Sequence, residues 1–207
     1  MGKNLDVNKP WNIDVYGNNI SIGENVHIRT SKNLITQICS WNKNNCDGVI
    51  NIGDNVLISP GVRIISAKEI IIKSNVMIAS NVYISDSDWH GIYDRINTPG
   101  SSQNITIEEN SWIGEGSKIS KGVRIGKNSI IGLGSVVTSN VPDNEIFGGN
   151  PAKKIGEIDK NKKIRKREDL FLNNDYNKLM KFLIKEDLKE NNFFTWLRVL
   201  FFPKKGD

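Results

Sequence analysis

An aliphatic residue returns at every sixth position through the second half of the chain. The buried face of a helix recurs every three to four residues and that of a strand every two. A strict period of six therefore predicts short strands joined at corners, which is typical of a parallel β-helix. Glycine follows several of these positions, where an uncrowded backbone suits a corner. The regular series consists of Ile107, Ile113, Ile119, Ile125, Ile131 and Val137, and shorter series precede it at Ile22 and Ile28, at Ile52, Ile58 and Ile64, and at Ile72, Ile78 and Ile84.

The gaps between these series predict where the chain leaves the solenoid. Three hexads make a coil of 18 residues, and Ile22 and Ile52 are 30 apart, so a polar stretch within about residues 30–50, around Trp41, must bulge out. The separation of Ile72 and Ile107 is 35 residues, which predicts a long loop at about 85–104. Long loops on a rigid scaffold often carry function.

The same patterns divide the chain into three parts. Residues 1–19 lack the repeat and are predicted to form a cap, with Trp11 and Tyr16 closing the first coil. Residues 20–157 form the solenoid. Residues 158–207 are richer in leucine and begin with a basic run, which indicates a tail with helices at about 169–188 and 192–202.

Composition narrows the choice of partners. The net charge of +5 and the pI near 9.1 reflect mainly the basic run at 160–167, which suits an anionic partner or a solvated linker. No basic stripe interleaved with aromatic residues crosses the repeats, which disfavours nucleic acid. Cys39 and Cys46 lack a second pair for a zinc site, so we expect free thiols and no metal. No apolar run is long enough to span a membrane and no secretory signal is evident, so a cytoplasmic location is expected.

The long loop concentrates chemistry, because it contains one of the two histidines of the chain beside carboxylates, aromatic residues and an arginine. Histidine is suited to act as a base near neutral pH. One ring nitrogen of His90 must then be held by an acceptor, for which Asp86, Asp88 or a backbone carbonyl would serve. Its neighbours Trp89, Tyr93 and Arg95 are candidate acceptor-binding residues.

Three features together indicate a family: the hexapeptide repeats, the loop sequence Asp88-Trp89-His90-Gly91, and the segment from Asn110-Ser111-Trp112-Ile113-Gly114 to Gly149-Asn150-Pro151-Ala152-Lys153. From about Ile20 to Ile158 the chain resembles the hexapeptide-repeat acyltransferases, and most closely their maltose and galactoside acetyltransferases and bacterial polysaccharide O-acetyltransferases. The resemblance implies an all-β solenoid, a left-handed parallel β-helix with a protruding active-site loop and, here, a C-terminal α-helical tail.

The resemblance also implies a homotrimer with acetyl-CoA bound between neighbouring subunits. His90 then matches the catalytic histidine, and Lys153 falls where a basic residue approaches the nucleotide phosphates. Ser139 stands where sugar acetyltransferases often have lysine, so Lys154 is a substitute candidate for that contact. The remaining candidate acetyl-CoA-binding residues are Trp112, Gly114, Leu133, Gly134 and Ser135.

The leading hypothesis is O-acetylation of a sugar hydroxyl on a polysaccharide, oligosaccharide or precursor, by direct transfer with His90 as general base. N-acetylation of an amino-sugar nucleotide is the alternative enzyme, and a non-catalytic scaffold is the alternative without one. The three-histidine zinc site of the γ-carbonic anhydrases cannot be filled, because the chain has only two histidines. Aromatic residues between Phe193 and Phe202 suit either a membrane surface or a neighbouring subunit.

Overall fold

The structure, a computed structural model, describes residues 2–42, 46–96, 100–172 and 193–202, together with Lys178, Lys181, Phe182 and Lys185. Residues 1–167 form one compact unit and residues 168–207 a second. The first unit is the predicted solenoid, and it carries the loop and the candidate site.

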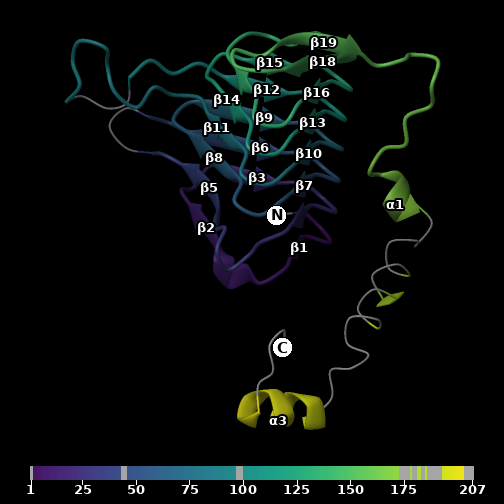
Figure 1. The fold of residues 1–207 in the computed structure, drawn as a ribbon. Helices are drawn as coiled ribbons and strands as arrows, with labels where there is room; N and C mark the ends of the chain where they lie inside the picture. Colours follow the sequence, from purple (N-terminus) through teal and green to yellow (C-terminus); the bar gives the residue numbers. More distant parts are fainter. Residues whose placement is uncertain are drawn as a thin grey trace. The chain divides into compact units, whose positions relative to one another are not determined.

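Three sheets of stacked parallel strands form the walls of the solenoid (Figure 1). Residues one coil apart pair directly: Ile28 pairs with Ile58, which pairs with Ile78. The first sheet contains β1 (Asp6–Val7), β4 (His27–Ile28), β7 (Leu57–Ile58), β10 (Met77–Ile78), β13 (Trp112–Ile113), β16 (Ile130–Ile131), β18 (Glu145–Gly148) and the antiparallel β19 (Lys153–Glu157). The second sheet contains β2 (Ile13–Tyr16), β5 (Thr36–Ser40), β8 (Arg63–Ser66), β11 (Tyr83–Ser85), β14 (Lys118–Ile119) and β17 (Val136–Val137). The third sheet contains β3 (Ile20–Ile22), β6 (Val49–Ile52), β9 (Glu69–Ile72), β12 (Ile105–Ile107) and β15 (Arg124–Ile125).

The sixth-position aliphatic residues fill the interior and are almost completely buried. The serines two positions before them are buried as well, and the hydroxyls of Ser111, Ser117 and Ser129 bond carbonyl oxygens in the next coil. Ser111 Oγ donates to the carbonyl of Gly126 at 2.8 Å, and Ser117 Oγ donates to that of Gly132 at 3.0 Å. These bonds satisfy polar groups that would otherwise be buried without partners.

An asparagine ladder runs along the corner between the third and first sheets, and sequence analysis missed it. Its members adopt left-handed backbone conformations with φ between 54° and 65°, which asparagine tolerates better than most residues. Asn110 Nδ2 donates to Asn128 Oδ1, and Asn128 Nδ2 to Asn144 Oδ1, each at 2.9 Å. An asparagine three residues before each buried position of the first sheet was the signal: Asn25, Asn55, Asn75, Asn110, Asn128 and Asn144.

The beginning of the chain differs from the predicted cap. Strands β1 and β2 pair with β4 and β5, so residues 1–19 already build a coil, with a short 3₁₀ helix at Pro10–Asn12. Trp11 is 77% exposed and does not close the end. The first predicted excursion is also interrupted, because β5 returns to the second sheet within it. The extra residues therefore form two insertions, one before β5 and one after it.

The basic run belongs to the first unit, so the division falls after Arg167 rather than after Glu157. Ile158 N donates to the carbonyl of Asn144 at 2.8 Å, Lys166 pairs with Glu109, and Arg167 Nε donates to the carbonyl of Asn55 at 2.8 Å. In the second unit, the described helices are α1 (Asp169–Leu172) and α3 (Phe193–Phe201). Helix α3 matches the second predicted helix, whereas much of the first lies outside the described residues.

Candidate active site

The long loop leaves the second sheet after β11 and enters the third sheet at β12, at the corner between those sheets. Its base is closed by bonds between its two ends. Gln103 N donates to the carbonyl of Asp86 at 2.9 Å, and Asp88 N donates to that of Ser101 at 3.1 Å. Ser102 Oγ donates to Ser87 Oγ at 3.0 Å. The part of the loop that carries His90 is therefore built on a fixed stem.

His90 lies exposed on this loop, and its Nδ1 is 2.9 Å from the carbonyl oxygen of Arg95. A carbonyl only accepts, so Nδ1 of the neutral ring carries the proton and Nε2 carries the lone pair. This is the orientation that a general base needs. Two glycines allow the tight path: a Cβ on Gly91 would lie 2.6 Å from the carbonyl oxygen of Asp94, and one on Gly100 would lie 2.2 Å from that of His90.

The two aspartates proposed to orient His90 have other partners, and the carbonyl alternative is the one observed. Asp86 is completely buried. Its carboxylate accepts from Ser66 Oγ at 2.7 Å, Ala67 N at 2.7 Å and Lys68 N at 3.0 Å. It thereby fixes the corner of the coil below the loop. Asp88 forms an ion pair with Lys121.

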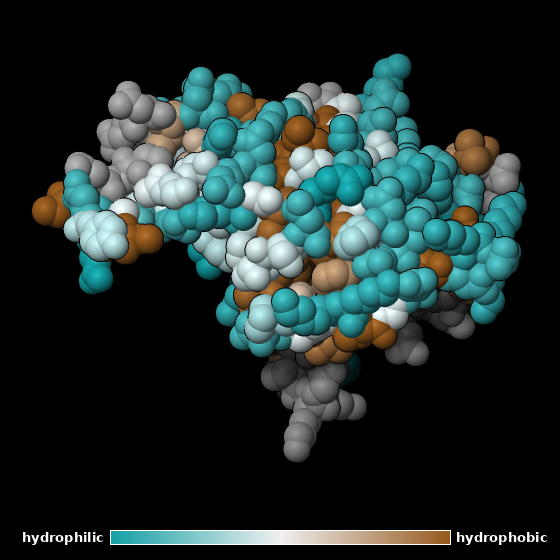
Figure 2. Space-filling model, turned by 90° about the horizontal axis from the view of Figure 1, so that it is seen from above, coloured by the Kyte–Doolittle hydropathy of each residue, from teal (hydrophilic) through white to brown (hydrophobic). Residues whose placement is uncertain are grey.

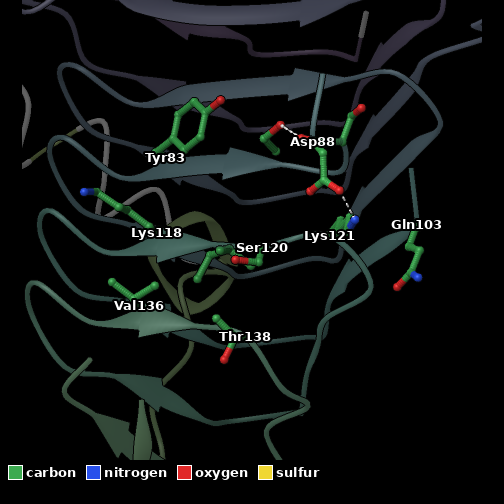
Figure 3. Close-up of a pocket in the computed structure, with 11 residues that line it drawn as sticks. Tyr83, Asp88, Gln103, Lys118, Ser120, Lys121, Val136 and Thr138 are labelled. Atoms are coloured by element: carbon green, nitrogen blue, oxygen red, sulfur yellow. Dashed lines mark hydrogen bonds and ion pairs between the residues drawn. The ribbon is translucent and has the colours of Figure 1, made fainter. Parts of the chain in front are cut away.

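A hollow of about 560 Å³ opens on the outer face of the second sheet, beside the base of the loop (Figure 3). Its wall combines two lysines and several hydroxyl side chains with apolar surface, and the Lys121–Asp88 ion pair crosses its edge. Arg63 lies 5.0 Å from the centre of the Tyr83 ring, which is cation–π distance. The lining residues come from β11, β14, β17 and the positions directly after them, and from the two ends of the loop, and of these only Asp88 was predicted as a site residue: Tyr83, Ser85, Ser87, Asp88, Gln103, Lys118, Ile119, Ser120, Lys121, Val136 and Thr138.

The residues expected to contact acetyl-CoA lie elsewhere on the prism. Gly114, Leu133, Gly134 and Ser135 lie at the corner between the first and second sheets. Leu133 is 82% exposed, and a Cβ built on Gly134, at φ 66°, would meet nothing within 4 Å. This open ledge has room for an extended chain along the backbone. The Ser135 hydroxyl instead points inward to the carbonyl of Gly132 at 2.6 Å.

Trp112 lies on the outward face of the first sheet, 48% exposed, between Met77 and Ile130. In a three-sided prism, that face is opposite the corner from which the His90 loop projects. A single chain therefore does not bring Trp112 and His90 into one site.

The tip of the loop also exposes apolar side chains, with Ile92 76% and Ile96 92% exposed. Figure 2 shows hydrophobic atoms at the left extremity of an otherwise mainly hydrophilic face.

The remaining predicted site residues are at the surface. Lys153 is exposed, whereas Lys154 Nζ pairs with Glu145 at 2.9 Å and with Glu157. Hydrogen bonds and charge from Glu157 and Glu145 raise the pKa of Lys154. Lys153 is therefore the better placed of the two for a phosphate. Tyr93 is fully exposed, and Arg95 contributes its carbonyl to His90.

The described residues contain no group of three His, Cys, Asp or Glu side chains arranged to hold a metal ion. Likewise, no helix in the described parts of the chain has the length and apolar character needed to cross a bilayer.

Comparisons with known proteins agree with this geometry. Residues 104–139 match the model for the bacterial transferase hexapeptide (six repeats). The galactoside O-acetyltransferase of Escherichia coli K12 is 32% identical over 160 residues, which are 76% of this chain and 63% of that protein. The chain thus spans just under two thirds of that relative's length. The structure of AntD, an N-acyltransferase from Bacillus cereus in complex with dTDP and 3-hydroxybutyryl-CoA, superposes with a TM-score of 0.52 at 21% identity, covering 87% of this chain and 90% of that one. The predicted left-handed parallel β-helix is confirmed.

Proposed function

Since the chain belongs to the bacterial hexapeptide-repeat transferases, we propose that it is an acetyl-CoA-dependent O-acetyltransferase acting on a sugar hydroxyl of a polysaccharide, oligosaccharide or its precursor. The observation that carries this proposal is the state of His90: its Nδ1 is engaged by the Arg95 carbonyl, and the residue is exposed on a loop with a fixed stem. The identity with a galactoside O-acetyltransferase supports the choice of a sugar hydroxyl.

The proposed reaction needs one proton acceptor. The acceptor hydroxyl forms a bond to the acetyl carbon as the carbon–sulfur bond of the thioester breaks, and the hydroxyl proton passes to Nε2 of His90. The imidazolium that forms is stabilised because Nδ1–H already donates to the carbonyl of Arg95. The proton then returns to the thiolate that leaves, which restores the neutral ring.

The donor fits the open ledge at Leu133 and Gly134, where the absence of a side chain on Gly134 leaves the backbone accessible. Lys153 supplies positive charge for the phosphates, because Lys154 is already paired with two carboxylates. This pairing argues against Lys154 as the replacement for a lysine at position 139.

We further propose a homotrimer in which each site combines the His90 loop of one subunit with Trp112 of its neighbour. The prism geometry supports this, because the two residues face away from each other in one chain. Coexpression of His90→Ala and Trp112→Ala chains tests it. Each variant alone should be nearly inactive, whereas randomly mixed trimers should regain about a quarter of the wild-type sites. If mixing restores no activity, His90 and Trp112 do not contribute to one site shared between two subunits.

The activity itself is tested by release of CoA thiol from acetyl-CoA with a panel of sugars and amino-sugar nucleotides. We expect a sugar hydroxyl to support turnover and His90→Ala to lower kcat by roughly 10²- to 10⁴-fold, the usual contribution of a general base. Ile96→Ala, at an exposed position of the same loop, is the control for general disturbance of the loop. Turnover only with an amino-sugar nucleotide, with a smaller loss in His90→Ala, would favour the N-acetyltransferase alternative. Equal rates for His90→Ala and wild type would remove the basis of the proposal.

We propose that the protein is cytoplasmic and contacts the membrane surface peripherally through α3. Its exposed aromatic residues include Phe194, at 78%, and Trp196, at 54%, close to Arg198. Such helices bind anionic interfaces through apolar burial and charge. Co-sedimentation with phosphatidylglycerol vesicles should be lost when residues 190–207 are deleted. Unchanged sedimentation of the deletion variant would leave contact with a neighbouring subunit as the explanation for these side chains.

A further inference from the structure

Three aromatic side chains form a row at the corner between the second and third sheets; none of them belongs to the core, and only Trp89 was predicted as a site residue. Tyr16 ends β2, Trp41 follows β5, and Trp89 lies in the long loop. The Tyr16 and Trp41 ring centroids are 6.1 Å apart, and those of Trp41 and Trp89 are 5.5 Å apart. We call these three residues the aromatic row. It ends at Trp89, the residue directly before His90.

The rings are tilted rather than stacked flat, with interplanar angles of 59° and 57°. Their faces are therefore not hidden against each other. Tyr16 is 46% and Trp41 42% exposed, and neither belongs to the solenoid core. Aromatic rings used only for packing bury far more of their area. Tyr16 and Trp41 therefore present aromatic surface to solvent, and the partly buried Trp89 continues the row toward His90.

Trp89 is held in place at a conformational cost. Its φ of 64° is unusual for a bulky residue, and such a conformation persists only where the surroundings enforce it. Here Trp89 N donates to Ser87 Oγ at 3.1 Å, and the indole Nε1 donates to Ser85 Oγ at 3.0 Å. The polar atom of the indole is thus satisfied, and the ring is directed toward Trp41.

Uncharged amides flank the aromatic surface. Asn18 and Asn19 follow Tyr16 and are exposed, and Asn42 follows Trp41. Ser40 Oγ donates to Asn42 Oδ1 at 3.2 Å, which fixes that side chain beside the row. Flat rings edged by amide donors and acceptors complement a pyranose, whose C–H face is apolar and whose rim is covered with hydroxyl groups.

We propose that the aromatic row is a binding track for the sugar units next to the one acetylated at His90, so that the acceptor is an oligosaccharide or polysaccharide rather than a monosaccharide. This inference rests on the proposed function, because the catalytic role of His90 determines at which end of the row the acetylated sugar unit lies. The row leads directly into the loop that carries His90, because Trp89 is its last member. A neighbouring copy of the chain is the competing occupant.

The first test measures binding without the donor, so that it does not depend on acetyl transfer. Wild-type protein is titrated calorimetrically with malto-, cello-, galacto- and chito-oligosaccharides, each from the monosaccharide to the hexasaccharide. We expect affinity to rise with chain length in at least one series, and Trp41→Ala to weaken binding of the longest member by on the order of tenfold or more, as for other aromatic anchors. Trp41→Phe should retain most of the affinity, since it keeps a ring.

Trp11→Ala is the matched control, because Trp11 is also an exposed tryptophan, at 77%, but lies outside the row. It should bind like wild type. The proposal is overturned if no series binds its hexasaccharide more tightly than its monosaccharide, or if Trp41→Ala binds as well as wild type. It is equally overturned if Trp41→Ala dissociates the oligomer in light-scattering measurements, because the row is then a subunit contact.

Acetyl transfer separates this proposal from the one on which it rests. If binding depends on chain length but no CoA is released, the proposal of a binding track stands and the proposed acetyltransferase activity is wrong. If monosaccharides are acetylated and longer acceptors give no gain, the proposed activity stands and the proposal of a binding track is wrong. If both hold, kcat/KM should fall more in Trp41→Ala for the hexasaccharide than for the monosaccharide.

Discussion

A single methyl group at Gly100 should disable the proposed base by displacing the backbone of His90, without a change to the imidazole itself. The Cβ of Gly100→Ala would lie 2.2 Å from the carbonyl oxygen of His90 and 2.6 Å from its carbonyl carbon. Both are backbone atoms, which cannot swing aside as a side-chain end would. Restoring an ordinary contact of at least about 3 Å requires a displacement approaching 1 Å, and a shift of this size in a catalytic group typically costs about 10²-fold in rate.

The assay is CoA thiol release under saturating donor, together with thermal unfolding. We expect kcat of Gly100→Ala to fall by about 10²-fold while Tm changes little, because the clash lies in a surface loop. Gly156→Ala in β19 is the matched control, since its new Cβ would make only an ordinary contact of 3.5 Å with Ile146 Cδ1. A Gly100→Ala enzyme with wild-type kcat would show that the position of the His90 backbone does not limit the reaction.

Two further predictions concern stability. Asp86→Ala leaves three donors, Ser66 Oγ, Ala67 N and Lys68 N, without their buried acceptor. Urea denaturation should therefore show that the free energy of unfolding falls by about 3 kcal/mol or more. Asp88→Ala removes only a partly exposed ion pair and should lower the free energy of unfolding by at most about 1 kcal/mol. Burial, with help from Arg167 and Arg29, lowers the pKa of His27 to about 4. As pH falls below 6.5, the unfolded chain therefore binds the extra proton first, and the free energy of unfolding should drop by up to about 3 kcal/mol between pH 6.5 and pH 4. A His27→Gln variant should lack that part of the pH dependence; if its free energy of unfolding in chemical denaturation changes with pH as in wild type, the assignment is contradicted.

The solenoid could be predicted because its signal is both local and repeated. Each hexad places one aliphatic residue inside, and parallel stacking sets Ile28, Ile58 and Ile78 in direct register. The first coil escaped detection because β1 and β2 lack the strict period, although they pair with β4 and β5. Pairing with an existing edge is a tertiary effect, which overrides weak local patterns.

The site was harder to predict than the fold. The sequence places Asp86 four residues from His90, and sequence proximity suggested contact. In the structure, the same carboxylate is directed into the coil below, because two backbone N–H groups and a serine hydroxyl converge there. The group that holds His90 is a backbone carbonyl, which every residue possesses and which leaves no sequence signal. The hollow at Tyr83 and Lys118 likewise depends on strand register rather than on a motif.

The topology also explains why the insertions meet. The chain turns from the second to the third sheet at the same corner in every coil, so Tyr16, Trp41 and the long loop all leave the prism along one edge. The coil between those of Trp41 and the loop passes this corner through Ala67, a small residue whose N–H is bonded to Asp86. Trp89 is thereby able to approach Trp41 across that coil. Asp86 is thus best understood as a positioning residue: it secures the corner over which the aromatic row and the His90 loop come together, and its replacement should weaken oligosaccharide binding as well as stability.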